Sequence, residues 1–260
     1  SNTMGARESL KTTGFVLRTL NYGESDLIVT FFSSDFGKLK GIAKGAKRSK
    51  KRFANVFEPF SLTNIIFTRK SRDMLAFIDA CEIVDHYDSV RLDLEKTLIA
   101  SYFIDLTDHF SPEGKKNENV FELLQTFLAL LGKENASDAL VRFFEIRLLK
   151  LAGFEPALDS CIVCKKPLTN GNAYYFHAQE GGIKCAQCAR PELYGQSVSA
   201  GAIRTLLLGR DMDVEKIKLI ALSGSLAAES RNILVGFITH VLNREVKSLR
   251  VMEQVRKLCT

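Results

Sequence analysis

The chain has 260 residues, of which 46% are apolar and 25% are charged, so it can form one large domain or two to three small ones. No stretch reaches the roughly 20 apolar residues of a membrane helix, and the first residues lack a secretory signal pattern. Residues 1–80 hold 14 Lys and Arg against 7 Asp and Glu, whereas residues 81–260 hold 22 against 23. The net charge of +6 therefore lies in the first third of the chain and predicts a polyanionic partner there.

The first 84 residues have the pattern of short β-strands. Apolar and β-branched runs alternate with turn-forming clusters, and the runs lie at residues 14–20, 27–32, 38–44, 60–68 and 75–84. In the third run lysines alternate with small or apolar residues, which predicts that Lys38, Lys40 and Lys44 share one face of a strand. Five short strands separated by turns predict a small closed barrel or a sandwich.

From residue 94 the apolar residues recur at helical spacing. The first predicted helix covers residues 94–110, and Asn117 and Ser137 can cap a second and a third helix. Helices resume after Ser199, and a further helix is expected over residues 226–249. At this spacing the apolar stripes indicate a helical core, not binding grooves.

Two cysteine pairs, Cys161–Cys164 and Cys185–Cys188, interrupt the helical part. A Cys-x2-Cys pair can hold one metal ion from a single turn, and two pairs complete a tetrahedral four-sulfur zinc site. Such a site is closed to water and substrate, so it predicts one structural zinc ion per chain. Two disulfides, or four unrelated buried thiols, are the alternatives. Thiols in metal-type pairs favour a reducing compartment, hence a cytoplasmic location.

A run of cations follows the third predicted strand, with no acid between Asp35 and Glu58. A basic strand that continues into a basic loop can follow a phosphate backbone, so we expect nucleic-acid contacts here. The candidate residues are Lys38, Lys40, Lys44, Lys47, Arg48, Lys50, Lys51 and Arg52, with Arg69 and Arg72 as an extension. A solvated loop is the alternative. Tyr22, Phe36 and Phe53 are aromatics that could stack on unpaired bases, although Phe36 and Phe53 are more commonly turn or core residues.

The motifs that would indicate an enzyme are incomplete. His177 lacks the following Glu of a zinc deaminase, and a second thiolate pair would fill its metal site. No phosphate-binding loop has the required spacing, and no βαβ unit supports a redox Cys-x2-Cys. The sequence therefore predicts a protein without catalytic turnover.

Several stretches resemble the RecO family of bacterial DNA repair proteins. They are residues 16–26 (VLRTLNYGESD), 37–46 (GKLKGIAKGA), 57–60 (FEPF), 142–149 (RFFEIRLL), 153–156 (GFEP) and 244–250 (REVKSLR), together with the four cysteines. The resemblance covers nearly the whole chain. It implies an α+β multidomain protein, with an N-terminal five-stranded OB-fold β-barrel and a C-terminal all-helical domain that contains an inserted four-cysteine zinc module.

The resemblance also implies a function in recombination. Members bind single- and double-stranded DNA, anneal complementary strands, and with RecR help to load RecA onto DNA coated by single-strand binding protein. The acidic tail of that protein is expected on the helical domain, where Arg142 and Arg147 are candidate contacts. The expected domains are residues 1–84 (OB fold), 85–156 and 194–260 (helical) and 157–193 (zinc module). An RNA-binding accessory factor and a pure interaction scaffold are the other hypotheses.

Overall fold

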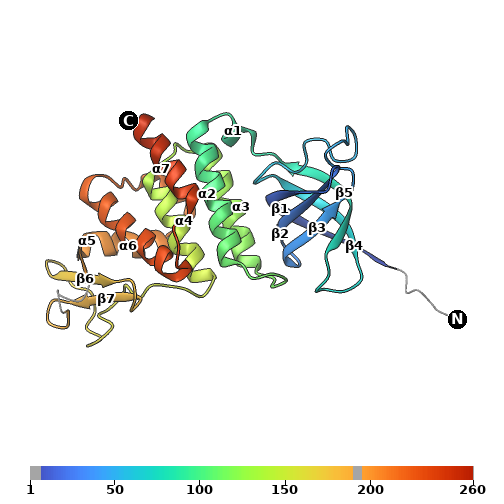
Figure 1. Ribbon diagram of the computed structural model, residues 1–260. Helices are drawn as coiled ribbons and strands as arrows, with labels where there is room; N and C mark the ends of the chain where they lie inside the picture. Colours follow the sequence, from blue (N-terminus) through green and yellow to red (C-terminus); the bar gives the residue numbers. More distant parts are fainter. Residues whose placement is uncertain (1–6, 190–194, 260) are drawn as a thin grey trace. The chain divides into compact units, whose positions relative to one another are not determined.

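The computed structural model describes residues 7–189 and 195–259. They form two compact units: unit 1 comprises residues 7–133 and 251–259, and unit 2 comprises residues 134–189 and 195–250 (Figure 1). The three domains expected from the sequence, in four segments, stay a prediction. Among the helices of the described ranges, none is long and apolar enough to cross a lipid bilayer.

Unit 1 begins with a closed barrel of five strands. These are β1 (Glu8–Tyr22), β2 (Asp26–Ser33), β3 (Gly37–Ala43), β4 (Leu62–Arg69) and β5 (Ala76–Asp85). Around the barrel the order is β1-β2-β3-β5-β4, and only the β3–β5 pair is parallel. This is a five-stranded OB-fold barrel, so the predicted fold class is confirmed for this part of the chain.

The barrel core follows from the alternation of residues along each strand. On β3, Leu39 is buried in the core, whereas Lys38 and Lys40 lie on the outer face, as the sequence pattern predicts. The loop between β3 and β4 adds Phe53 and Val56 to the same core, with exposed fractions of 4% and 8%. These two side chains therefore anchor the basic part of this loop to the barrel core.

Three helices complete the first part of unit 1: α1 (Asp88–Arg91), α2 (Leu94–Phe110) and α3 (Glu118–Lys133). The bounds of α2 agree with the predicted helix, and the Asn117 side chain accepts a hydrogen bond from the Val120 amide at 3.1 Å, as predicted for a cap. Phe121 of α3 packs against Phe15 of β1, with ring centroids 5.1 Å apart. Aromatic packing thus joins the helices of unit 1 to its barrel.

Unit 2 combines helices with a small sheet. Its elements are α4 (Asp138–Leu151), β6 (Ala173–His177), β7 (Gly182–Cys185), β8 (Gln196–Ser199), α5 (Ala200–Asp211), the 3-10 helix η1 (Val214–Leu219), α6 (Gly224–Leu242) and the start of α7 (Lys247–Cys259). The sheet has the order β7-β6-β8. Ser137 caps α4 as predicted, because its hydroxyl accepts a hydrogen bond from the Leu140 amide. The predicted helical region with a cysteine module inside it is confirmed.

One predicted helix is wrong in its extent. The sequence predicted a single helix over residues 226–249, but the chain ends α6 at Leu242 and begins α7 at Lys247. Asn243 adopts the left-handed conformation, with φ of 54°, and its amide bonds back to the His240 carbonyl. Asn tolerates this conformation better than most residues and so ends the helix, although the apolar pattern continues past it.

Candidate nucleic-acid interface and metal centre

The basic loop after β3 is fixed through its backbone. The Gly45 amide donates to the Asp26 carboxylate at 2.8 Å, and the Lys47 amide donates to the Ser25 carbonyl at 3.0 Å. The side chains stay exposed because the backbone supplies these contacts. The exposed cations of this loop are Lys44, Lys47, Arg48, Lys50, Lys51 and Arg52, a set that we call the basic loop. The structure therefore brings six predicted residues together on one surface segment.

Two members of the basic loop contact β5. The Arg52 guanidinium donates to the Asp79 carbonyl at 2.7 and 2.9 Å, so it is held against that strand. The Lys44 ammonium lies 5.4 Å from the centroid of the Phe77 ring, also on β5. The basic loop is thus positioned along the start of β5.

The β4–β5 connection adds further cations. The Arg69 guanidinium lies 5.0 Å from the centroid of the Phe36 ring. Burial lowers the pKa of Arg69, and the neighbouring charge of Arg72 lowers it further. Strand pairing places Thr68 opposite Phe77 and Ile42 on the other side of Phe77. The basic loop and the β4–β5 connection therefore both adjoin the start of β5.

The two strand lysines have acidic partners. The Lys38 ammonium lies 2.7 Å from an oxygen of Asp108 on α2, and the Arg18 guanidinium lies 2.8 Å from the other carboxylate oxygen. Burial raises the pKa of Asp108, but the hydrogen bonds from Lys38 and Arg18 outweigh it and lower that pKa overall. Lys40 pairs with Glu113 at 2.7 Å. Their DNA contact stays a prediction, but within unit 1 these charges are already neutralised.

The two arginines expected to bind a protein tail are engaged inside unit 2. Arg142 is 4% exposed, and its guanidinium lies 2.7 Å from Glu145, one turn further along α4. Arg147 donates to the carbonyls of Gly209 and Met212, at 2.8 and 2.5 Å, and its burial lowers its pKa. A partner-binding role for either arginine stays a prediction, and it would require these contacts to be exchanged.

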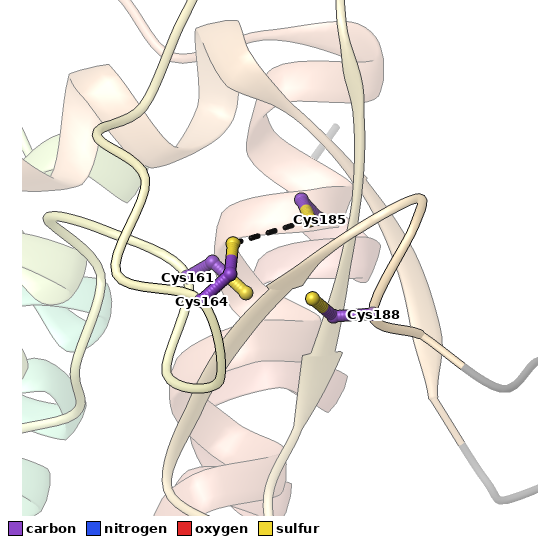
Figure 2. A group of neighbouring side chains, drawn as sticks. All are labelled: Cys161, Cys164, Cys185 and Cys188. Atoms are coloured by element: carbon purple, nitrogen blue, oxygen red, sulfur yellow. Dashed lines mark hydrogen bonds between the residues drawn. The ribbon is translucent and has the colours of Figure 1, made fainter.

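The four cysteines of the two predicted pairs converge (Figure 2). The Cys161 carbonyl accepts from the Lys165 amide at 3.0 Å, and the Cys185 carbonyl accepts from the Cys188 amide at 3.0 Å, so each pair lies on a tight turn. All four sulfur atoms lie within 4.8 Å of one another, and those of Cys164 and Cys185 are 3.8 Å apart. A tetrahedral ion with bonds of about 2.3 Å to sulfur needs sulfurs roughly 3.8 Å apart, so this cluster can hold a metal ion.

The pKa values of two of these thiols shift in opposite directions. Burial raises the pKa of Cys161, but backbone amides directed at its sulfur lower it more, to about 6. The hydrogen bond with Cys185, together with burial and the neighbouring thiols, raises the pKa of Cys188 to about 12. Four thiolates so close together repel one another, and a bound cation removes that repulsion.

Sequence reasoning missed Phe77, Asp108 and Glu113. Phe77 lies between two inward-facing residues of a predicted strand, so alternation alone could have placed it on the outer face. Asp108 gave no local signal, because 70 residues separate it from Lys38. Asp108 lies on the polar face of α2, where contact with water is enough to explain a charged residue.

The barrel, the helices and the cysteine cluster define an OB-fold protein with a four-cysteine module. Family models described as recombination protein O, N terminal and C terminal, match residues 7–87 and 91–250. The chain is 48% identical over 259 residues to the DNA repair protein RecO of Syntrophus aciditrophicus. The matched residues cover 98% of this chain and 99% of that protein. It therefore belongs to the RecO family of DNA repair proteins.

Other members of this family are similar over nearly the same length. The DNA repair protein RecO of Geobacter metallireducens is 34% identical over 248 residues, or 95% of this chain and 98% of that protein. That of Desulfatibacillum aliphaticivorans is 33% identical over 251 residues, or 95% of this chain and 97% of that protein. The similarity extends across the barrel, the helices and the cysteine module alike.

Proposed function

We propose that this chain is a non-enzymatic mediator of DNA repair by homologous recombination in the bacterial cytoplasm. It binds single- and double-stranded DNA, anneals complementary strands, and with RecR helps to load RecA onto DNA covered by single-strand binding protein. Family membership supports this proposal, and the basic loop on an OB-fold barrel is the observation on which it depends. Cations on that loop can follow a phosphate backbone without reading its sequence.

Two hollows of the described residues lie outside the basic loop. A cavity of about 400 Å³ adjoins the cysteine module and is lined mainly by neutral side chains, such as Thr169, Asn172 and Tyr174. Among the residues that line it there is neither a carboxylate nor a histidine. A second hollow, on the barrel, has Asp35 and Glu82 in its lining, and the Thr12 hydroxyl donates a hydrogen bond to the Asp35 carboxylate there at 2.8 Å.

The DNA-binding test is a titration of labelled single strands at several salt concentrations. If the basic loop makes about five to seven phosphate contacts, the logarithm of affinity should fall with the logarithm of salt at a slope of roughly −3 to −5. A flat response would remove the proposal. Competition by RNA of the same sequence separates DNA repair from the alternative of an RNA-binding accessory factor. Co-purification with RecR, and with the tail peptide of single-strand binding protein, tests the partners.

We also propose that the cysteine cluster holds one structural zinc ion per chain. The sulfur spacing supports zinc, and four protein ligands leave no position for substrate. Elemental analysis of metal-replete protein should find about one zinc per chain. Cys161→Ser should lower that content and destabilise unit 2, while Cys81→Ala, a buried barrel cysteine, should keep the zinc. Full zinc content in Cys161→Ser would contradict the site.

A further inference from the structure

The face of the barrel that OB-fold proteins commonly use is covered in unit 1. Oligonucleotides usually lie across the second and third strands of such a barrel. Here Phe32 of β2 packs against Phe121 of α3, with centroids 6.3 Å apart, and Lys38 of β3 is held by Asp108. A side chain at Gly37 would place its first carbon 2.1 Å from the Lys115 carbonyl, so the connection between α2 and α3 closely approaches the turn before β3. A nucleic acid needs another path.

Phe77 indicates such a path on the side of β3 where that strand pairs with β5 instead of β2. It lies on β5 between the inward-facing Ala76 and Ile78, and its ring is half-buried on the outer surface of the barrel. The Arg7 guanidinium lies 4.8 Å from the centroid of its ring, and the Lys44 ammonium lies 5.4 Å from it. Two cations on exposed, flexible side chains therefore cover one aromatic ring.

The other aromatic candidates are less suited to stacking. Phe53 is 4% exposed and belongs to the barrel core. Phe36 is half-buried like Phe77, but its ring packs edge-on against Phe67 of β4, with centroids 5.4 Å apart. Tyr22 is 54% exposed, but it lies at the β1–β2 turn, and no cation–ring contact of the described residues involves it.

We propose that Phe77 is a stacking platform for an unpaired base of single-stranded DNA, with Arg7 and Lys44 as its phosphate contacts. This inference rests on the proposed function and adds a residue that distinguishes single strands from duplex. On binding, the two cations move from the ring to the flanking phosphates, and a base takes their place. The exchange is favourable because stacking of a base on an aromatic ring contributes more binding free energy than the contact of an exposed cation with that ring. The displaced cations also gain contacts with the flanking phosphates.

The absence of tryptophan from the sequence allows a direct test. Phe77→Trp introduces a single indole, whose fluorescence should be quenched when an oligo-dT strand is added and recovered when salt dissociates the complex. Tyr22→Trp, at the β1–β2 turn, and Phe154→Trp, in unit 2, are matched controls that should show little quenching. Strong quenching in Tyr22→Trp with none in Phe77→Trp would overturn the proposal.

Affinity provides the second measurement. Phe77→Leu keeps an apolar side chain but removes the ring, so its affinity for single strands should fall about 10-fold while its affinity for duplex changes less than about two-fold. Phe77→Tyr keeps the ring and should restore single-strand affinity. Equal losses on both substrates would assign Phe77 a structural role and overturn the proposal. If the wild-type protein binds no oligonucleotide at low salt, the proposed function itself is wrong. If the wild type binds and Phe77→Leu binds single strands with the same affinity, only this inference is wrong.

Discussion

Two parts of one basic run differ in what their charges contact. Lys38 and Lys40 lie on a regular strand and are paired with Asp108 and Glu113. The cations of the basic loop, a few residues later, extend from a segment that is fixed by its backbone and by two buried apolar anchors. The comparison teaches that equal charge density along a sequence can serve two purposes. The strand lysines join the barrel to the acids of α2 and the segment after it, whereas the loop cations extend to the surface, with Arg52 alone among them described as held by carbonyls of β5.

The largest expected effect comes from reversing the loop. Lys47→Glu, Arg48→Glu and Lys50→Glu together should lower single-strand affinity by about 100-fold or more near 0.1 M salt, because each lost phosphate contact is worth about five-fold there. The salt slope should become shallower by about 2. Fluorescence anisotropy with labelled oligo-dT measures both quantities.

A matched reversal in unit 2 controls for net charge. Lys216, Lys218 and Lys247 are also exposed, and their reversal to Glu changes the charge equally. We expect affinity to change less than about three-fold in this control, because these three lysines are not part of the basic loop and their reversal removes none of its phosphate contacts. Similar losses in both triple variants would mean that overall charge, not the basic loop, determines binding.

The second effect concerns the strand part of the run. Lys38→Met should lower the free energy of unfolding of unit 1 by about 2 kcal/mol, since it removes one of two cations from a mostly buried carboxylate. Urea denaturation followed by circular dichroism measures this change. Under folding conditions the same variant should bind single strands nearly as well as the wild type. A loss of affinity as large as that of the loop variant, without a loss of stability, would show that Lys38 contacts DNA and does not stabilise unit 1.

The pH dependence of stability tests Asp108 more finely. Its pKa in the folded protein lies below the ordinary 3.8, so its charged form stabilises the fold above that pH, and the contribution is lost as pH falls through the folded-state pKa. Asp108→Asn should therefore be less stable than the wild type at pH 7. The difference should shrink towards pH 3, as measured by urea denaturation at each pH. A constant difference would show that charge is not the cause.

The smallest effect is expected for the second strand lysine. The side chains of Lys40 and Glu113 are 38% and 64% exposed, compared with 11% and 14% for Lys38 and Asp108. Lys40→Met should therefore change the free energy of unfolding by no more than about 0.5 kcal/mol, because water screens an exposed pair. Thermal denaturation of Lys38→Met and Lys40→Met under the same conditions compares the two losses of stability. Equal losses would contradict the smaller contribution of Lys40.

Local patterns predicted much of the fold. The strand alternation around Leu39, the helix over residues 94–110 and the caps at Asn117 and Ser137 depend on neighbours within a few residues, and the structure confirms each. The cysteine cluster was predictable for the same reason, because each pair of ligands lies on one turn. Sequence spacing contains this information directly.

What depends on distant residues was not predictable. Arg142 lies on α4, most of whose residues are buried, and its buried guanidinium pairs with the buried Glu145 of the same helix. Nothing in the local pattern shows that neighbouring elements surround a helix. The pairing of Lys38 with Asp108 belongs to the same class, since it joins residues 70 positions apart. Charge counting alone could not separate these internal pairs from a binding surface.

The composition of unit 1 has a consequence for the order of synthesis. Its last segment, residues 251–259, includes Met252, which is 1% exposed, and Arg256, which lies 2.7 Å from Glu95 on α2. A ribosome releases the barrel and its first helices well before this segment, with all of unit 2 in between. Nascent chains fold largely as they emerge, so we expect unit 1 to complete its packing only after residues 251–259 have left the ribosome.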